Sequence, residues 1–309
     1  MEFTIRRMEP GDWADIGELI YISINYWYHT HGAGPRFLNG PESTQLFCKI
    51  YEDIDPGCCV LAENANTGKI AASCFFHPRE THISIGIMNV HPNYFGLGAG
   101  RVLMNEILNI AKELDKPMRL VSSAINLDSF TLYNRCGFVP RQIFQDMYLE
   151  VPEDGLVVET PALTSNVRPA QPDDAPKLAD LEEELVGIRR EGDFIYFIEN
   201  TDGWWHGSVI EDDQGQIQGF LFSVDNEASN ILGPGVARTE EQTASLLHAE
   251  LNHHAGRKPV FLIPADCREL IETLYSWGAR NCEMHFSQTL GEWSAPTGIV
   301  LPTFMPETG

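Results

Sequence analysis

The sequence predicts an α/β fold made of two copies of one unit, because three local patterns occur twice in the same order. Each pattern combines apolar runs of strand or helix periodicity with a glycine or proline turn. The paired segments are residues 5–12 and 167–174, residues 60–70 and 209–217, and residues 132–138 and 274–279. One pair alone is compatible with chance, whereas three pairs in one order indicate duplication.

The chain length supports this division, since 309 residues are enough for two domains of ordinary size. Turn formers between the two copies predict a linker, and the last residues show no periodicity and predict an extended tail. The expected organisation is a first domain at 1–150, a linker at 151–165, a second domain at 166–290 and a tail at 291–309.

Composition excludes several classes of function. The net charge of −23 disfavours nucleic acid and anionic membranes as partners, and no apolar run is long enough to span a bilayer. The seven cysteines form no C-x-x-C pair, and residues 1–7 lack the apolar core of a signal peptide. We therefore expect reduced thiols, no metal and a cytoplasmic protein whose acidity is compatible with a cationic substrate.

The first copy opens with a strand and an amphipathic helix, and its most informative segment is a glycine-rich turn. The apolar run 83–90 predicts a buried strand before the turn. The helix after the turn is predicted by apolar residues at helical spacing, namely Leu103, Ile107, Ile110 and Leu114. Gly96, Gly98 and Gly100 let the backbone approach a ligand, and the free N–H groups at the helix start favour an anion. The segment therefore predicts a pyrophosphate cradle without a lysine.

Two other phosphate-binding motifs do not fit this turn. The dinucleotide motif needs G-x-G-x-x-G and an acid on a second strand about 20 residues further on. Here the glycines read G-x-G-x-G, and Asp115 lies at the end of the helix. The P-loop needs Gly-Lys-Ser/Thr, which the turn lacks.

A second motif identifies the ligand through a family resemblance. A strand at 119–124 leads into Asn126 and then L-Y-x-x-x-G-F at 132–138. Together with the V-x-P and G-x-G-x-G patterns of residues 90–100, this resembles the GNAT superfamily of acetyl-CoA-dependent N-acetyltransferases over roughly residues 3–150. The resemblance implies two tandem GNAT-like domains, each a mixed, mostly antiparallel sheet flanked by helices, with acetyl-CoA as cosubstrate. Phe95 departs from the family, which usually has Arg or Gln there.

The resemblance also implies which residues bind the cofactor. Met88, Asn89 and Val90 would pair with the pantetheine arm, and a backbone N–H among them would stabilise the oxyanion. The pyrophosphate would contact the turn residues Phe95, Gly96, Leu97, Gly98, Ala99, Gly100 and Arg101. Asn126 would contact the pantetheine amide or a water. The alternatives are that Asn89 is only a strand-end residue and that Asn126 caps a helix.

The same motif implies that Tyr133 donates a proton to the departing CoA thiolate, because an ordinary phenol is protonated at neutral pH. The alternative is a packing role in the core. No acid lies on the strand 83–90, so the candidate general bases are Glu80 and His82, just upstream. Period-2 counting from His82 places Ser84, Gly86, Met88 and Val90 on its face. A solvated turn is the alternative explanation for Glu80 and His82.

Residues 25–45 fall where the family usually recognises the amine acceptor. Tyr26, Trp27 and His29 are the candidate substrate-binding residues, since aromatic walls suit a cation or a ring. The alternative is that these aromatics fill a junction between the domains. His29 and His31 have metal-ligand spacing, but no further ligand set accompanies them, so we expect no metal.

The second copy lacks an equivalent cradle. We match the cradle to residues 231–238, where Pro234 removes a donor, and Pro264-Ala265-Asp266 replaces the later asparagine. We expect a degenerate domain that binds CoA poorly. The predicted function is acetyl transfer to an unidentified small amine in a ternary complex. The alternatives are a non-catalytic acyl-CoA sensor, or an enzyme that uses a longer acyl chain or a hydroxyl acceptor.

Overall fold

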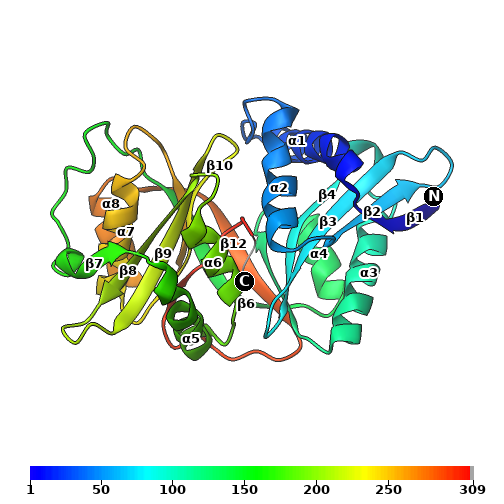
Figure 1. Ribbon diagram of the computed structural model, residues 1–309. Coiled ribbons are helices and arrows are strands. Elements are labelled where there is room, and N and C mark those ends of the chain that lie inside the picture. Colours follow the sequence, from blue (N-terminus) through cyan, green and yellow to red (C-terminus); the bar gives the residue numbers. More distant parts are fainter. Residues whose placement is uncertain (307–309) are drawn as a thin grey trace. The chain divides into compact units, whose positions relative to one another are not determined.

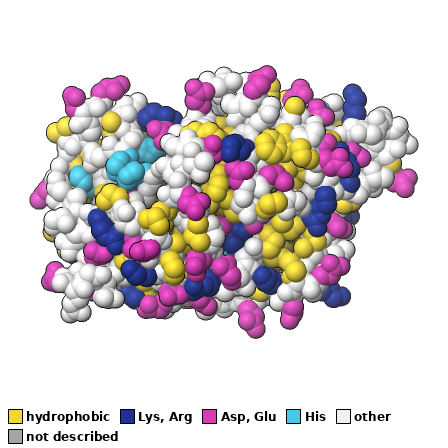
Figure 2. Space-filling model, viewed as in Figure 1, with side chains coloured by type: hydrophobic (Ala, Val, Ile, Leu, Met, Phe, Trp, Pro, Cys, Tyr) yellow, Lys and Arg dark blue, Asp and Glu magenta, His cyan; other side chains and the backbone are white. Residues whose placement is uncertain are grey.

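The computed structural model describes residues 1–306, and the chain divides into two compact units (Figure 1). The first unit contains Met1–Pro78, Ile83–Met118 and residues 305–306. The second unit contains Arg79–His82 and Arg119–Phe304. None of the described helices is long and apolar enough to cross a membrane. Acidic side chains are spread over the face drawn in Figure 2, in keeping with the net charge.

The first unit contains a four-stranded antiparallel sheet in the order β1-β2-β3-β4. Helices α1 and α2 lie on one side of this sheet and α3 on the other (Figure 1). The elements are β1 (Phe3–Arg7), α1 (Trp13–Thr30), α2 (Gln45–Ile54), β2 (Cys59–Asn64), β3 (Ile70–Pro78), β4 (Ile83–Val90) and α3 (Ala99–Leu114). The strand and the helix predicted on either side of the glycine turn are thus confirmed.

A bulge in β4 overturns the simple alternation expected along this strand. Cys74 of β3 pairs with Met88 and Phe76 pairs with Ile85, so one residue of β3 lies opposite two residues of β4 between these pairs. The extra residue reverses the faces beyond it, because side chains alternate with period 2. Met88 therefore shares a face with Ile85 and not with Ser84, and the expectation that Ser84 and Met88 face the same way is wrong.

The buried face of α3 differs at its end from the expected one. Leu103 and Ile107 are fully buried, but Leu114 is 46% exposed at the last residue of the helix. The other buried residues of the helix are Ala99, Met104 and Ala111. The prediction fails at Leu114 because the chain leaves the helix there, with Asp115 in the left-handed region as the C-cap.

The second unit is built on a sheet in the order β5-β12-β6-β11-β10-β9-β8-β7, with β13 paired to β10. Its strands are β5 (Met118–Ser123), β6 (Val139–Tyr148), β7 (Val167–Pro169), β8 (Trp205–Glu211), β9 (Ile217–Asn226), β10 (Ser229–Ala237), β11 (Val260–Pro264), β12 (Arg280–Leu290) and β13 (Ile299–Leu301). Its helices are α4 (Leu127–Arg135), α5 (Ala175–Val186), α6 (Glu191–Glu199), α7 (Glu240–Asn252) and α8 (Arg268–Ser276).

The two sequence repeats exchange their last strands inside this sheet. β12, from the second repeat, lies between β5 and β6 of the first, and β6 lies between β12 and β11 of the second. The β6–β12 pairing runs from Tyr148 with Arg280 to Val139 with Thr289. Each repeat therefore completes the sheet of the other through backbone hydrogen bonds.

The segments expected to be a linker and a tail are both tied into the second unit. Val151 is buried, and its N–H donates to the Arg257 carbonyl at 2.9 Å. The Leu156 N–H donates to Asn252 Oδ1 at 2.9 Å. The tail supplies β13, which pairs antiparallel with the end of β10. Both segments are therefore fixed to the second unit by hydrogen bonds, which a flexible linker or a free tail would lack.

Cleavage within residues 152–165 is therefore expected to leave the two fragments associated. The cut removes one covalent bond, whereas the hydrogen bonds between β6 and its neighbours β11 and β12 remain. Limited proteolysis followed by native size-exclusion chromatography tests this, with a sample denatured in urea as the control for complete cleavage. Two separately eluting, folded fragments would contradict the strand exchange.

A buried histidine in the second unit makes stability depend on pH. His254 is 1% exposed, and burial lowers its pKa from an ordinary 6.5 to about 4, against the opposing effects of Asp225 and Glu250. Between these values the unfolded chain binds the proton and the folded chain does not. His254 therefore costs no stability above about pH 6.5, and the cost grows as pH falls toward 4.

We expect His254 to cost the folded state about 2 kcal/mol at about pH 5. Urea unfolding of the wild type and of His254→Gln at about pH 7.5 and pH 5 measures this cost. The stability of the variant relative to the wild type should rise at the lower pH, because glutamine does not titrate. An unchanged difference between the two proteins at both pH values would show that His254 does not titrate as described.

Candidate active site

The glycine turn of the first unit joins β4 to α3 in an open conformation. A short 3-10 helix at Pro92–Tyr94 is followed by Gly96 and Gly98, which have φ values of 73° and 95°. These are left-handed conformations that glycine adopts without steric cost. A Cβ atom added at either glycine would meet no other atom within 4 Å. The glycines are therefore required for conformation, and the space beside them is open to a ligand.

The turn presents backbone donors at the start of α3. The N-cap of α3 is Gly98, which has no side chain to satisfy the first turn, and the first turn contains no acid. The Val102 N–H donates to the Gly98 carbonyl at 3.1 Å. Within residues 1–306 no acceptor is found for the N–H groups of Gly96, Gly98, Ala99, Gly100 and Arg101. Such a helix start favours an anion.

Two of the predicted pyrophosphate donors are used inside the turn itself. The Phe95 N–H donates to the Pro92 carbonyl at 3.2 Å, and the Leu97 N–H donates to the Tyr94 carbonyl at 3.2 Å. The turn is further held by His91, whose Nδ1 accepts the Asn93 N–H at 3.1 Å. These hydrogen bonds stabilise the turn. The donors that remain available to a ligand are the N–H groups of Gly96, Gly98, Ala99, Gly100 and Arg101.

At the end of β4, the side chain of Asn89 lies on one face of the sheet, and those of Met88 and Val90 lie on the other. Asn89 is 3% exposed, and its Oδ1 accepts a hydrogen bond from Ser23 Oγ of α1 at 2.7 Å. Met88 and Val90 are half-buried and lie on the opposite face. The amide of Asn89 thus anchors β4 to α1, and a cofactor role at this residue is left to its backbone.

The aromatic segment at the end of α1 contacts the glycine turn within the first unit. The rings of Tyr26 and Phe95 lie 6.0 Å apart, and both side chains are exposed. Trp27 stacks on His31 at 4.1 Å, and His29 is exposed. Neither His29 nor His31 belongs to a cluster of described residues with metal-ligand geometry. The structure therefore brings Tyr26 beside the predicted cradle.

The second motif lies on α4 of the second unit. Asn126 is the N-cap, and its Oδ1 accepts the Ser129 N–H at 3.1 Å, so the predicted capping role is confirmed. Tyr133 is 8% exposed, and its ring packs edge-on against Phe138 at 6.1 Å. The tyrosine ring is thus part of the packing of this unit, as the alternative interpretation expected.

The two candidate bases lie in a turn that belongs to the second unit. Glu80 is exposed, and its Oε1 accepts the Glu191 N–H at 3.3 Å at the start of α6. His82 is 1% exposed, with Nδ1 3.0 Å from Thr81 Oγ1. The carboxylate of Glu80 therefore stabilises the positive end of a helix, and the imidazole of His82 is shielded from solvent.

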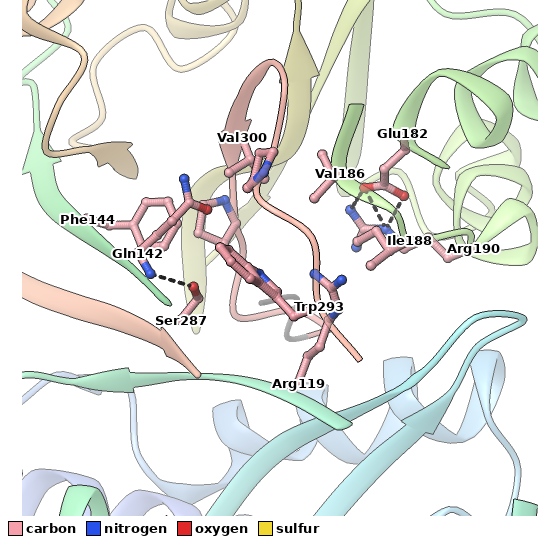
Figure 3. Close-up of a pocket in the computed structure, with 12 residues that line it drawn as sticks. Arg119, Gln142, Phe144, Glu182, Val186, Ile188, Arg190, Ser287, Trp293 and Val300 are labelled. Carbon is pink, nitrogen blue, oxygen red and sulfur yellow. Dashed lines mark hydrogen bonds and ion pairs between the residues drawn. The ribbon is translucent and has the colours of Figure 1, made fainter. Parts of the chain in front are cut away.

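A polar cavity in the second unit was not anticipated from the sequence. It has room for about one water. It contains a buried ion pair in which Glu182 Oε1 accepts from Arg190 Nη2 at 2.6 Å (Figure 3). Burial lowers the pKa of Arg119 to about 10, against the opposing charge of Glu182. The lining residues are Arg119, Gln142, Phe144, Glu182, Val186, Ile188, Arg190, Ser287, Trp293, Pro296, Val300 and Pro302. They come from five separate parts of the chain, so no local spacing signals the cavity.

The buried thiols are poor nucleophiles. Burial raises the pKa of Cys48 and of Cys267 to about 12, and it raises the pKa of Cys59 well above its ordinary value. A protonated thiol does not attack a thioester, because the thiolate is the reactive form. These three cysteines are therefore structural.

In the second repeat, side chains cap the N-terminus of α7, the helix that corresponds to α3 of the first repeat. Residues 229–237, which include most of the segment matched to the cradle, form strand β10, so that match is wrong. Only Arg238 and Thr239 separate β10 from α7, because the strand continues where a loop was expected. Thr239 Oγ1 accepts the Gln242 N–H, and Gln242 Oε1 accepts the Thr239 N–H. This capping box and the two acids of the first turn disfavour an anion.

β13 also covers part of the edge of β10. Ile231 and Leu232 pair with β11, but the next paired residues on that edge, Gly235–Ala237, pair with β13 instead. β10 and β11 therefore separate beyond Leu232, and β13 from the C-terminal tail pairs with β10 there.

Comparisons with known proteins agree with this duplication. The sequence profile of the acetyltransferase (GNAT) family matches residues 24–138, and that of a GNAT acetyltransferase domain matches residues 178–286. No curated protein matches the sequence. The fold is similar to that of a candidate acetyltransferase from Pyrococcus horikoshii, with 17% identity and a TM-score of 0.73 over 98% of this chain and 95% of that one.

Two further solved structures share the fold. A GCN5-related N-acetyltransferase from Sphaerobacter thermophilus has 17% identity and a TM-score of 0.64 over 93% of this chain and 95% of its own. A tandem GNAT protein from the clavulanic acid biosynthesis pathway has 12% identity and a TM-score of 0.60 over 95% of this chain and 100% of its own.

Proposed function

We propose that this chain, which belongs to the GNAT acetyltransferase family and carries two GNAT domains in tandem, transfers an acetyl group from acetyl-CoA to a small amine. The observation that carries the proposal is the open N-terminus of α3. Its glycine turn presents five backbone N–H groups without an acceptor among residues 1–306. A CoA pyrophosphate is the anion that this family binds at such a turn.

We propose further that one acetyl-CoA binds per chain, in the first repeat. The α7 helix start of the second repeat is capped by Thr239 and Gln242 and carries Glu240 and Glu241. The edge of β10 is paired with β13 where a pantetheine arm would add a strand in a functional family member. Both features oppose a second cofactor, one by charge and one by occupying backbone donors and acceptors.

The proposed reaction is direct transfer in a ternary complex. The amine attacks the thioester carbonyl, a backbone N–H near Met88–Val90 stabilises the oxyanion, and Tyr133 protonates the leaving thiolate. Glu80 and His82 remain the proposed bases for deprotonating the amine. The protonated thiols of Cys48, Cys59 and Cys267 support transfer without an acyl-cysteine intermediate.

A non-catalytic acyl-CoA sensor is the second candidate. It is favoured by the β4 strand, which carries no acid, and by the two candidate bases, one of which caps α6 while the other is buried. The sensor and the enzyme share the cradle but differ in turnover.

A panel of small amines incubated with the purified chain and acetyl-CoA separates the two candidates. Mass spectrometry should detect an acetylated amine for at least one acceptor class, with heat-denatured protein as the control. Stoichiometric binding of acetyl-CoA without any acetylated product across the panel would favour the sensor.

A further inference from the structure

Three histidine–carboxylate pairs among the described residues can be compared, and one of them differs from the other two. His77 Nδ1 lies 2.7 Å from Asp55 Oδ2, and His206 Nδ1 lies 2.9 Å from Glu250 Oε1, both in aligned hydrogen bonds. His285 Nδ1 lies 2.8 Å from an oxygen of the third carboxylate, that of Asp146, yet it makes no aligned hydrogen bond. His285 is 93% buried, so water does not readily replace that bond.

A third ligand-type side chain converges on this pair. Glu283 is the register partner of Asp146 across the β6–β12 ladder, and His285 follows two residues later on the same face of β12. One ligand atom from each of the three side chains lies within 4.8 Å of the other two. Ser123 Oγ of β5 donates a 2.5 Å hydrogen bond to Glu283 Oε1 and so orients that carboxylate.

We propose that Asp146, Glu283 and His285 form a binding site for one divalent transition-metal ion, with zinc as the best match. Imidazole and carboxylate are ligands that zinc takes together, at about 2.0–2.2 Å from the metal. In a tetrahedral site, two ligand atoms at that distance from one ion lie about 3.3–3.6 Å apart. The Nδ1–Oδ2 separation of 2.8 Å is shorter than this by about 0.5 Å, so His285 and Asp146 must move slightly apart to hold the ion, and the ligand atoms of all three side chains already lie within 4.8 Å of one another.

Charge supports a cation over a shared proton. Two carboxylates this close repel each other in a buried site, and a divalent ion offsets both charges at once. An ion also explains the misaligned pair, because two ligands of one metal direct their lone pairs at the metal and not at each other. The His77–Asp55 pair provides the contrast, since its 2.7 Å separation is similar, its hydrogen bond is aligned, and it belongs to no cluster of three ligand-type side chains among the described residues.

The site lies on the seam where the repeats exchange strands. Asp146 is on β6 of the first repeat, and Glu283 and His285 are on β12 of the second. A bound ion would therefore tie the exchanged strands together. Because it binds only the folded chain, it would raise the thermal midpoint.

Zinc content of the full chain tests the site. The purified protein is stripped with a chelator, incubated with zinc chloride, desalted and analysed by mass spectrometry for bound metal. We expect about one zinc per wild-type chain, a loss of most of that zinc in His285→Gln and Asp146→Asn, and retention in His77→Gln. Circular dichroism verifies that each variant is folded.

Two further measurements keep the result unambiguous. Cys282→Ser, beside the cluster, should retain zinc, and anomalous scattering at the zinc edge from wild-type crystals should place the ion between β6 and β12. Absence of stoichiometric zinc in the wild type would overturn the site, as would equal zinc in the wild type and in His285→Gln. Loss of zinc in Cys282→Ser with retention in His285→Gln would assign the metal to the thiol and also overturn it.

Discussion

Gly98→Pro is expected to abolish CoA binding. Gly98 has φ 95°, whereas proline is fixed near −65° and has no N–H, so the substitution distorts the turn and removes a donor. The affinity should fall at least about 100-fold, which is about 2.7 kcal/mol. Isothermal titration calorimetry with CoA measures the change against a wild-type stoichiometry of one.

Gly68→Pro is the matched control for this substitution. Gly68 lies in the β2–β3 turn of the same unit, has φ 67° and also has open space at its Cβ position. Its substitution should affect stability but not CoA affinity. Wild-type CoA affinity in Gly98→Pro would show that the pyrophosphate binds elsewhere.

Tyr133→Phe is expected to lower the rate of acetyl transfer by about 10²–10⁴-fold with little change in CoA affinity. The substitution keeps the ring that packs against Phe138 and removes only the hydroxyl. The proposed acid therefore disappears while the local packing remains. Steady-state rates with a saturating amine, together with calorimetry, separate the two effects.

Tyr275→Phe provides the control in the second repeat. Tyr275 occupies the equivalent place on α8, is exposed, and donates a hydrogen bond to Gln145 Oε1. Its loss should leave the rate unchanged. A Tyr133→Phe enzyme as fast as the wild type would remove the proton-donor role and leave water as the proton source.

The predictable parts of the fold are those that depend on the spacing of apolar residues within one segment of the chain. The strand before the glycine turn and the helix after it follow from apolar spacing, and the duplication follows from the repeated patterns. The β4 bulge was not predictable, because an extra residue is visible only against the register of β3. The faces assigned to Ser84 and Met88 by period-2 counting were wrong for that reason.

Long-range pairing accounts for the other differences. The exchange of β6 and β12 cannot be recognised from either strand alone, since the order in which strands far apart in the chain pair is not encoded within one strand. Pairing of β13 with β10 depends on the divergence of β10 from β11, which has no local signature. The same holds for the Arg119–Glu182–Arg190 cavity, whose charges meet only in the folded chain.

Amine-dependent release of free CoA thiol from acetyl-CoA tests the central claim most directly. With the acceptor found in the amine panel, the wild-type chain should release thiol at a rate that saturates with both substrates, and Gly98→Pro should release none above background. Thiol release that is independent of every amine, or the same in Gly98→Pro, would contradict an acetyltransferase that uses the glycine turn of the first repeat.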